Sequence, residues 1–358
     1  MRVKIASHMR AALLLTTFDF HMAATPQNNR FHHMLLGLVG TSFFVLLGMH
    51  VLNPSNTVSK APKAVLKPVE HKKLSKADMD AIAGESPSSL NGRLTVNDLN
   101  QTFNKIGYEL DPVLKGTSDV PRVFLTSLPI DLAKIKQSEE RKSLFFRTLL
   151  PLVLKINEEL HEKRAKVWRF RHRLNIGLDI AGKDRIWLSG LFKRYRVEQG
   201  NFDALLQKMD VVPPSLALAQ AAEESGWGTS RFAREGNALF GQWTFNPKDK
   251  GIVPQGRDQG KSHRIKAFDS LADSLRAYVH NLNTHKAYLG LRKKRAAMRT
   301  SHQELSGYDL ARTLDKYSER GEHYVTSLHS IMSQNELGRF DQTALDGGEA
   351  TILKGPLI

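Results

Sequence analysis

The stretch Val212–Thr244 reads VPPSLALAQAAEESGWGTSRFAREGNALFGQWT and contains the clearest pattern in the chain. Its prolines, Pro213 and Pro214, are typical of the first turn of a helix. The segment Leu216–Ala222 is apolar except for Gln220, and a helix that is apolar on all sides is buried. We therefore predict a central helix that begins at the prolines and passes through the core.

Two glutamates stand at the end of this predicted helix. Glu223 and Glu224 come just before Gly226, a typical helix stop, and Trp227. A carboxylate at a helix C-terminus faces the negative end of the helix dipole, and apolar walls disfavour its charged form. Both effects raise the pKa of a carboxyl group, and cleavage of a glycosidic bond needs such an acid to protonate the leaving oxygen. The pattern does not decide which glutamate is buried, and a pair that only solvates the helix end is the alternative.

Outward from this stretch, the chain is mainly helical. A helix is predicted from the spacing of Leu149, Val153, Ile156 and Leu160, with Pro151 at a kink or in the first turn. A later helix, capped by Asp269 or Ser270, is predicted from the spacing of Leu271, Leu275, Tyr278 and Leu282. Between them, Gln242–Lys266 is too rich in glycine and proline for helix, so short strands are expected. The predicted fold class is mainly α with a small β lobe.

The N-terminal part of the chain predicts a location outside the cytoplasm. The uncharged stretch Met34–Leu52 would span about 28 Å as a helix, close to the thickness of a bilayer core. Basic residues before it favour a cytoplasmic N-terminus, and no convincing cleavage site follows. We interpret it as a signal anchor in the inner membrane rather than a cleaved signal peptide, which would give a secreted protein. The predicted domains are a cytoplasmic extension at 1–33, the anchor at 34–52, a flexible linker at 53–92, the catalytic domain at 93–340 and a loose tail at 341–358.

The composition narrows the possible partners. The 358 residues carry a formal net charge of +16 and contain no cysteine, which excludes disulfides and a cysteine nucleophile. Such a charge favours a polyanionic partner, whether nucleic acid, anionic lipid or an acidic wall polymer. It is concentrated in Lys163–Arg173 and Arg292–Arg299, which we interpret as solvated helix faces, with Trp168 and Phe170 as core anchors. No nucleic-acid motif accompanies them, so no nucleic acid is expected.

The central stretch resembles the glucosaminidases of glycoside hydrolase family 73, the mannosyl-glycoprotein endo-β-N-acetylglucosaminidase-like domains. The resemblance rests on LAQAAEESGWG at 218–228 and NALFG at 237–241. The stretches KSLFFRTLLPLVL at 142–154 and KYSERG at 316–321 are similar to the bacterial Bax-type subgroup. The resemblance covers about Val120–Gly338. It implies a lysozyme-like fold and an enzyme that acts on peptidoglycan glycan strands.

The resemblance also implies site residues. The family's catalytic glutamate precedes Ser-Gly-Trp-Gly, which places it at Glu224, while Glu223 stands where the family is usually apolar. The residues expected to bind the sugar are Gln220, Trp227, Asn237, Phe240, Trp243 and Tyr317; for Trp227, a place in the core is an equal alternative.

The sequence departs from the family in its second acid. Many members carry a glutamate in the β lobe, but between Trp243 and Ala267 the only acids are Asp249 and Asp258. Asp258 is the candidate second carboxylate, and a solvated turn residue is the alternative. Without it, the acetamido oxygen of the substrate or a weakly activated water attacks, so the stereochemical outcome stays open.

Three classes of function remain after these arguments. The first is an endo-β-N-acetylglucosaminidase, and the second is a muramidase or lytic transglycosylase of the same general fold. The third is a non-catalytic peptidoglycan-binding protein, which only the incomplete pair of carboxylates favours. No zinc-ligand cluster or serine nucleophile motif is visible, so an amidase is the weakest reading and neither a metal nor a cofactor is proposed.

Overall fold

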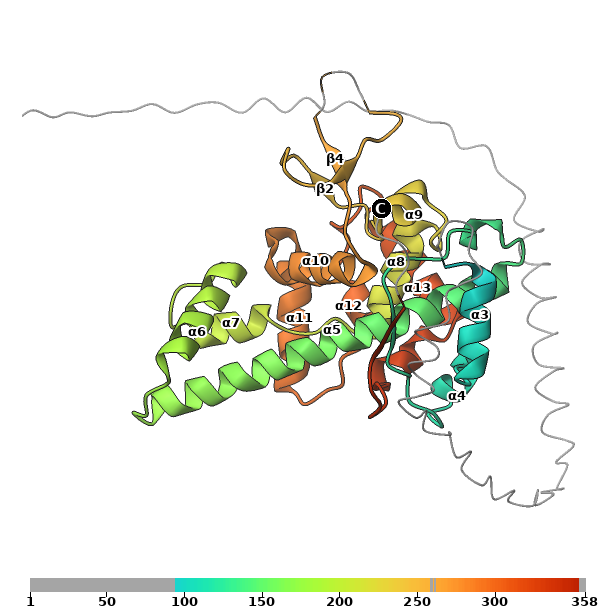
Figure 1. Ribbon diagram of the computed structural model, residues 1–358. Coiled ribbons are helices and arrows are strands. Elements are labelled where there is room, and N and C mark those ends of the chain that lie inside the picture. The colour runs from blue at the N-terminus through green and yellow to red at the C-terminus, as the bar shows by residue number, and fades with distance from the viewer. Residues whose placement is uncertain (1–93, 258–259, 261, 354–358) are drawn as a thin grey trace, which may run out of the picture. The chain divides into compact units, whose positions relative to one another are not determined.

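The computed structural model describes residues 94–257, 260 and 262–353 (Figure 1). The predicted extension, anchor and linker lie outside this part of the chain, as does Asp258. No helix in the described part is long and apolar enough to cross a membrane. The statements that follow concern the described residues alone.

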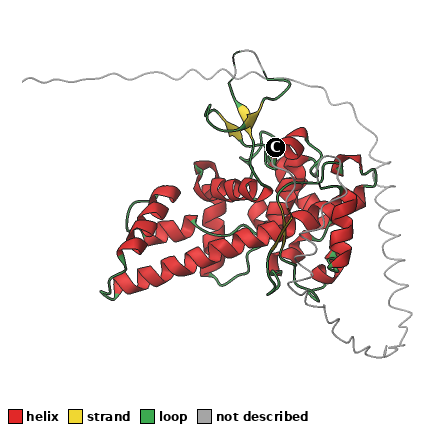
Figure 2. Cartoon of the chain, viewed as in Figure 1, coloured by secondary structure: helices red, strands yellow, loops and turns green. Residues whose placement is uncertain are grey.

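Helices make up most of the described chain, as predicted (Figure 2). The α-helices are α3 (Val96–Lys105), α4 (Leu110–Leu114), α5 (Ser138–Asn175), α6 (Gly182–Tyr195), α7 (Phe202–Lys208), α8 (Pro214–Ser225), α9 (Arg231–Gly236), α10 (Leu271–Thr284), α11 (Leu289–Thr300), α12 (Gly307–Ala311) and α13 (Glu322–Gln334). Short 3-10 helices are η2 (Leu132–Lys134), η3 (Lys286–Tyr288) and η4 (Leu337–Gln342). Helices α5, α8, α10 and α13 contribute a large part of the core.

Helix α8 is the predicted central helix, and every residue from its start at Pro214 to Ala222 is buried. It packs against α5, α12, α13 and η4. It ends where Gly226 adopts a left-handed conformation with φ of 57°, which glycine adopts without strain. At its other end, the carboxylate of Asp341 accepts hydrogen bonds from the backbone N–H and the hydroxyl of Ser215, both at 2.8 Å. The core therefore surrounds α8 and leaves its C-terminal glutamates at the edge.

Helix α5 is longer than the sequence pattern predicts. It runs for 38 residues and begins well before Pro151, which lies inside it. Its first half is largely buried against α8 and α10. Its second half extends away from the other helices of the core, and the chain then turns back into α6 (Figure 1). Phe170 is buried and packs edge-on against Trp187, but Trp168 is half exposed, so only the first of the two predicted core anchors is one.

The β lobe predicted between Gln242 and Lys266 is present as a three-stranded antiparallel sheet. Its strands are β2 (Trp243–Thr244), β3 (Gly251–Ile252) and β4 (Arg264–Lys266), in the order β2-β4-β3. Figure 1 shows this sheet extending from the helical body beside α9. The helix that follows, α10, is capped by Ser270, whose hydroxyl accepts from the backbone N–H of Asp273, as predicted.

Residues 341–353 pack on the rest of the described chain, which differs from the loose tail predicted from 341 onward. Strand β5 (Thr351–Leu353) pairs in parallel with β1 (Val123–Leu125), and Leu345 and Leu353 are buried. Asp341, just past the predicted boundary, caps α8. The segment contributes only a short strand and single anchoring side chains, which give no periodic signal in the sequence.

One buried ion cluster holds α11 against α5 and α7. Asp210 is 3% exposed, and the guanidinium groups of Arg164, Arg295 and Arg299 lie 3.5, 3.8 and 3.1 Å from its carboxylate. Arg295 is also buried, and its guanidinium donates to the carbonyl of Val211 at 2.7 Å. The basic run at 292–299 is therefore partly internal, which corrects its interpretation as a solvated face.

Candidate active site

The two glutamates at the end of α8 have different surroundings. Glu223 pairs with the guanidinium of Arg320, which is half exposed. Glu224 is half-buried and lies among aromatic side chains that come from α10, η3 and α13. The structure therefore separates a surface ion pair at Glu223 from an enclosed carboxyl at Glu224, a distinction that the helical pattern left open.

A chain of hydrogen bonds leads from the core to Glu224. The hydroxyl of Tyr278 donates to Oε1 of Gln220 at 2.8 Å, and Nε2 of Gln220 donates to the hydroxyl of Tyr324 at 2.8 Å. The hydroxyl of Tyr324 in turn is hydrogen-bonded to the carboxyl of Glu224. Because Gln220 occupies an oxygen lone pair of Tyr324 with its own N–H, the tyrosine proton is free to point at Glu224. The carboxyl group is thus held by a donor that the core fixes in place.

Two further tyrosines complete the surroundings of Glu224. Tyr317 lies between Tyr288 and Tyr324, with ring centroids 5.6 and 5.4 Å away. The pKa values of Tyr278, Tyr288, Tyr317 and Tyr324 are all raised, chiefly by burial and in part by the negative charge of Glu224. All four stay protonated, so they surround Glu224 with neutral rings and hydroxyl groups and with no cation of their own.

These surroundings raise the pKa of Glu224. Burial is the largest cause, because it removes water from the charged form. The hydrogen bond from Tyr324 opposes this shift, the charge of Glu223 adds to it, and Arg320 opposes it. The net effect favours the protonated carboxyl, which is the form that a general acid needs near neutral pH. The dipole argument from the sequence points in the same direction.

Three of the residues expected to bind sugar are buried and support the site from behind. Gln220 is 0% exposed, and both ends of its amide are bonded to tyrosines. Phe240 stacks on Tyr278 with centroids 3.9 Å apart, and Asn237 donates through Nδ2 to the carbonyl of Phe268 at 3.2 Å. The structure therefore assigns these three to positioning rather than to direct contact with a substrate.

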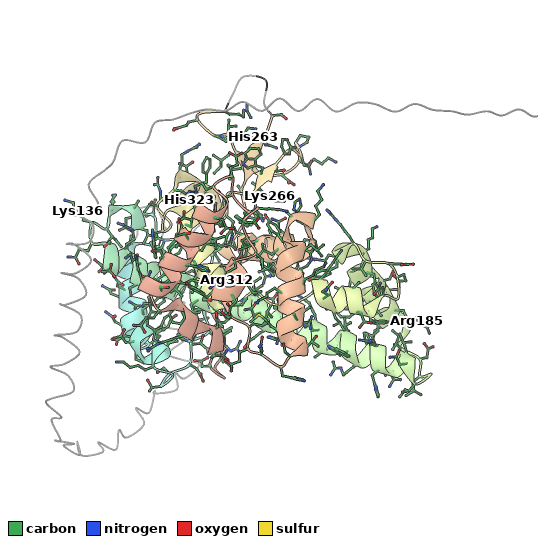
Figure 3. The ribbon with its side chains drawn as sticks, turned by 180° about the vertical axis from the view of Figure 1, so that it is seen from behind. Lys136, Arg185, His263, Lys266, Arg312 and His323 are labelled. Atoms are coloured by element: carbon green, nitrogen blue, oxygen red, sulfur yellow. The ribbon has the colours of Figure 1, made fainter. Side chains whose placement is uncertain are left out.

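The other three predicted residues are placed differently. Tyr317 is buried close enough to Glu224 for the charge of that carboxyl to raise its pKa. Trp227 packs edge-on against Phe145 and Phe146. This packing favours the interpretation of Trp227 as a core residue over that of a sugar-binding residue. Trp243 is 62% exposed in the β lobe and stacks on His263, whose position is labelled in Figure 3. Among the six residues expected to bind sugar, Trp243 therefore has the aromatic ring that is most accessible to a sugar.

Sequence reasoning missed most of the tyrosine surroundings. Tyr278 was assigned to the apolar face of a helix, where it does lie, and its hydroxyl was not considered. Tyr288 and Tyr324 stand in no motif of the quoted stretches. The one signal in the sequence was the place of Tyr278 on the apolar face of a predicted helix, because a buried tyrosine needs a partner for its hydroxyl.

The described residues offer no clear second acid. Asp249 accepts from the hydroxyl of Thr244 at 2.7 Å and pairs with Lys266 at 3.2 Å, and these contacts hold the pKa of its carboxyl low. Asp258, the predicted candidate, lies outside the described part of the chain. Within that part, no group of three histidine or acidic side chains could hold a metal ion.

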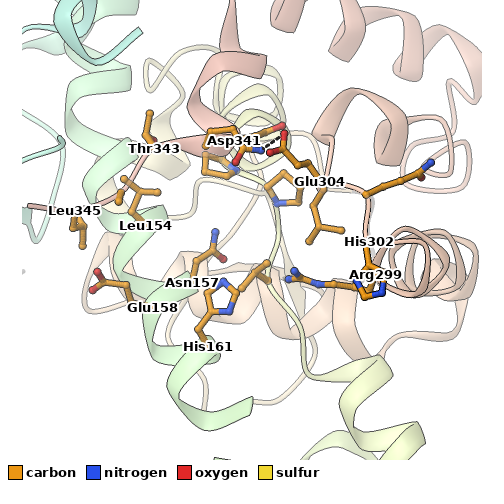
Figure 4. A pocket seen from close by; sticks show the side chains of 17 residues that line it. Leu154, Asn157, Glu158, His161, Arg299, His302, Glu304, Asp341, Thr343 and Leu345 are labelled. Atoms are coloured by element: carbon orange, nitrogen blue, oxygen red, sulfur yellow. Dashed lines mark hydrogen bonds between the residues drawn. The ribbon is translucent and has the colours of Figure 1, made fainter. Parts of the chain in front are cut away.

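A pocket also lies at the opposite end of α8. It has a volume of about 670 Å³ and is lined by Pro213 and Pro214 at the start of the helix, together with Asn157, His161 and Asp341 (Figure 4). Since Pro214 stands ten residues before Glu224 on α8, this pocket lies about 15 Å along the helix from Glu224. We therefore base the candidate site on the tyrosine-enclosed carboxyl and not on this pocket.

The region that contains this site is similar to known proteins. Residues 200–337 match the glucosaminidase family model, described as mannosyl-glycoprotein endo-beta-N-acetylglucosaminidase. The chain is 35% identical over 217 residues to the protein Bax of Escherichia coli strain K12, covering 59% of this chain and 75% of that protein. The chain belongs to the glucosaminidase family. It is a glycoside hydrolase, and the matched region of this glucosaminidase contains α8 and all four tyrosines.

A solved structure is also similar to the glucosaminidase. It is the catalytic domain of the autolysin Auto from Listeria monocytogenes, with a TM-score of 0.28 and 17% sequence identity. The similarity covers 48% of this chain and 94% of that one.

Proposed function

We propose that this glycoside hydrolase cleaves peptidoglycan at the β-1,4 bond after N-acetylglucosamine, with Glu224 as its general acid. The observation that carries the proposal is the placement of Glu224 at the end of a buried helix and among four protonated tyrosines, where burial raises its pKa. The glucosaminidase family and the relation to Bax support the substrate class.

The proposed chemistry follows from this carboxyl group. Protonated Glu224 gives its proton to the glycosidic oxygen as the bond from that oxygen to the sugar C1 breaks. The carboxylate left behind is stabilised by the hydrogen bond from Tyr324. C1 then bonds either to a water oxygen, which loses its proton to a base, or to the acetamido oxygen of the same sugar; in the second case water later opens the ring and its proton returns to Glu224. If Asp258 is the base that takes the proton of the water, Asp258→Asn should lose most of the activity; activity that survives would favour the acetamido route or a weakly activated water.

The remaining predictions complete the proposal. We place the catalytic domain outside the cytoplasm, held at the inner membrane by Met34–Leu52. Trp243 is proposed to stack on a sugar ring, since it is the most exposed of the predicted sugar-binding residues. Tyr317 is proposed to face the same sugar from the α13 side of Glu224.

The test is digestion of purified peptidoglycan, followed by borohydride reduction and mass spectrometry of the fragments. We expect fragments that end in reduced N-acetylglucosamine, formed by the wild-type protein and by Glu223→Gln but not by Glu224→Gln. Reduced muramic ends would replace the proposal with a muramidase, and anhydro-muramic ends with a lytic transglycosylase. Binding without any cleavage would favour a non-catalytic peptidoglycan-binding protein.

A further inference from the structure

The second half of α5 and the helix α6 form a strongly basic arm. Lys163–Arg196 contains eleven lysine and arginine residues and two aspartates, a net charge of +9 within a chain of +16. Both aspartates are already paired inside the arm, Asp184 with Lys166 at 2.9 Å and Asp179 with Arg185. Figure 1 shows this arm extending away from α8 and α13, and Figure 3 labels Arg185 near its end. The arm therefore carries more than half of the excess positive charge of the protein.

The end of the same arm also exposes apolar side chains. Five of the twelve large hydrophobic residues that are exposed in the described chain lie between positions 168 and 186. They are Trp168, Leu174, Ile176, Leu178 and Ile186, with exposed fractions of 50, 40, 56, 48 and 76%. Clusters of exposed apolar residues mark surfaces that bind a partner.

The exposure of these apolar residues does not result from poor packing of the arm. The arm has its own buried residues, among them Val167, Phe170, Ile180 and Leu188, and Phe170 packs edge-on against Trp187. Arg173 also donates to the carbonyl of Asp179 at 2.9 Å and so fixes the turn between the helices. The exposed aliphatic side chains therefore stand on a turn that is already folded.

We propose that the end of this arm docks on the surface of a bilayer that contains anionic phospholipid. Aliphatic side chains and a tryptophan enter the boundary between headgroups and acyl chains, and the surrounding arginines and lysines bind the phosphates. A nucleic acid or a glycan strand matches the charge but offers no apolar layer for Leu174, Ile176, Leu178 and Ile186. The bilayer is the polyanion that satisfies both features.

Docking at this end sets the distance of the candidate active site from the membrane. Trp227, three residues past Glu224, packs on Phe146 of α5. Leu174 lies 28 residues further along the same helix, which corresponds to about 42 Å. With α5 upright on the bilayer, the arm would hold Glu224 roughly that far from the surface. This surface is independent of the function proposed for Glu224.

The absence of cysteine allows a local test in the full chain. Ile176→Cys carries a polarity-sensitive fluorophore at the end of the arm, and Val253→Cys carries it in the β lobe, where Val253 is 47% exposed. Vesicles contain nitroxide-labelled lipid in either phosphatidylcholine alone or an equal mixture with phosphatidylglycerol. We expect the probe at position 176 to be quenched several-fold more strongly in the mixture, while the probe at 253 changes little. A local probe is needed because Met34–Leu52 is itself expected to bind both vesicles.

Matched charge variants complete the test. Arg169→Gln with Lys183→Gln removes two exposed charges from the arm, and Lys293→Gln with Lys294→Gln removes two exposed charges from α11. In the protein labelled at position 176, only the first pair should reduce quenching. Equal quenching at both probes, equal quenching in both lipids, or an equal effect of the two pairs would overturn the proposal. A response to duplex DNA without one to vesicles would replace it with a nucleic-acid surface.

Discussion

Asp210 and Glu224 are two enclosed carboxyl groups at opposite ends of the segment that contains α8, and their pKa values shift in opposite directions. Asp210 is buried more completely, yet the charges of Arg295 and Arg164 and the contact with Arg299 outweigh the burial and lower its pKa. Glu224 is half-buried, and Arg320, the cation that acts on it among the described residues, is already paired with Glu223. The pKa of Glu224 therefore rises, although Glu224 is the more exposed of the two.

The comparison teaches that burial alone does not set the protonation state of a carboxyl group. A carboxylate with a cation on several sides becomes a fixed ion that joins helices, as Asp210 joins α5 and α11. A carboxyl group enclosed by neutral tyrosines holds its proton to higher pH than a free one, which suits it to proton transfer. The predictions below test whether the two groups differ in role as they differ in pKa.

The largest expected effect is the loss of activity in Glu224→Gln. Removal of a general acid lowers the rate by about 10²- to 10⁴-fold. Glutamine has nearly the same shape and carries no charge, so we expect the variant to fold as well as the wild type. Initial rates on peptidoglycan and thermal unfolding measure the two quantities on one preparation. A variant that keeps full activity would remove Glu224 from the mechanism.

Asp210→Asn is expected to give the opposite result. It leaves Arg295, which is 1% exposed, without its anionic partner. Breaking one side of a buried ion pair costs about 3–5 kcal/mol, and the asparagine oxygen should keep the loss near the lower end of that range. Denaturant unfolding measures the free energy, and the specific activity of the folded fraction should stay close to that of the wild type. Unchanged stability would contradict the structural role of the cluster.

The pH dependence of stability should separate the two groups. Since the pKa of Asp210 is lowered on folding, its stabilising contribution is present above its unfolded value of about 3.9 and is lost as the pH falls through the folded value. Since the pKa of Glu224 is raised, its contribution is present below its unfolded value of about 4.3 and is lost as the pH rises through the folded value. Unfolding measured across this range should lose the first slope in Asp210→Asn and the second in Glu224→Gln.

A smaller effect is expected for Tyr324→Phe. The hydroxyl of Tyr324 stabilises the charged form of Glu224, so its removal raises the pKa of Glu224 further and moves the alkaline limb of the pH–rate profile to higher pH. The variant also leaves Nε2 of Gln220 without its acceptor in the core, which costs about 1–3 kcal/mol of stability. Tyr308→Phe is a suitable control, because Tyr308 is 38% exposed.

The smallest effects concern the ion pair beside the site. The charge of Glu223 raises the pKa of Glu224, so Glu223→Gln should move the alkaline limb to lower pH. Arg320 lowers that pKa, so Arg320→Gln should move the limb to higher pH. Both residues are at the surface and salt screens their charges, so both shifts should shrink in high salt. Shifts in the same direction would contradict the assigned electrostatics.

The sequence predicted the parts of the fold that depend on local pattern. The limits of α8 followed from Pro213, Pro214 and Gly226, and the β lobe followed from its glycines and prolines. The pairing of β5 with β1 was missed because it joins segments more than two hundred residues apart. The burial of Arg295 was missed because a basic run predicts solvent, and the acceptors that satisfy this arginine come from the loop after α7.

The sequence pointed to Glu224 at the centre of the candidate site but not to most of the tyrosines around it. Two signals pointed to Glu224: the motif that contains it and its place at the end of a predicted helix. Both signals are local, because they lie within one stretch of sequence. Gln220 and Phe240 were expected to touch the sugar because they stand in or near that motif, whereas packing turns them toward Tyr278 and Tyr324. Which side of a helix faces a neighbouring tyrosine is decided by tertiary packing, which the local sequence does not encode.

The most direct test of the central claim is a titration of the carboxyl group of Glu224 itself. Carbon-13 NMR of protein labelled at the glutamate side-chain carboxyl would identify this signal by its absence in Glu224→Gln. We predict a pKa above the usual range of glutamate, and the alkaline limb of the pH–rate profile should coincide with it. A signal that titrates within or below that usual range would contradict the account, because Glu224 would then be charged at neutral pH and unable to donate a proton.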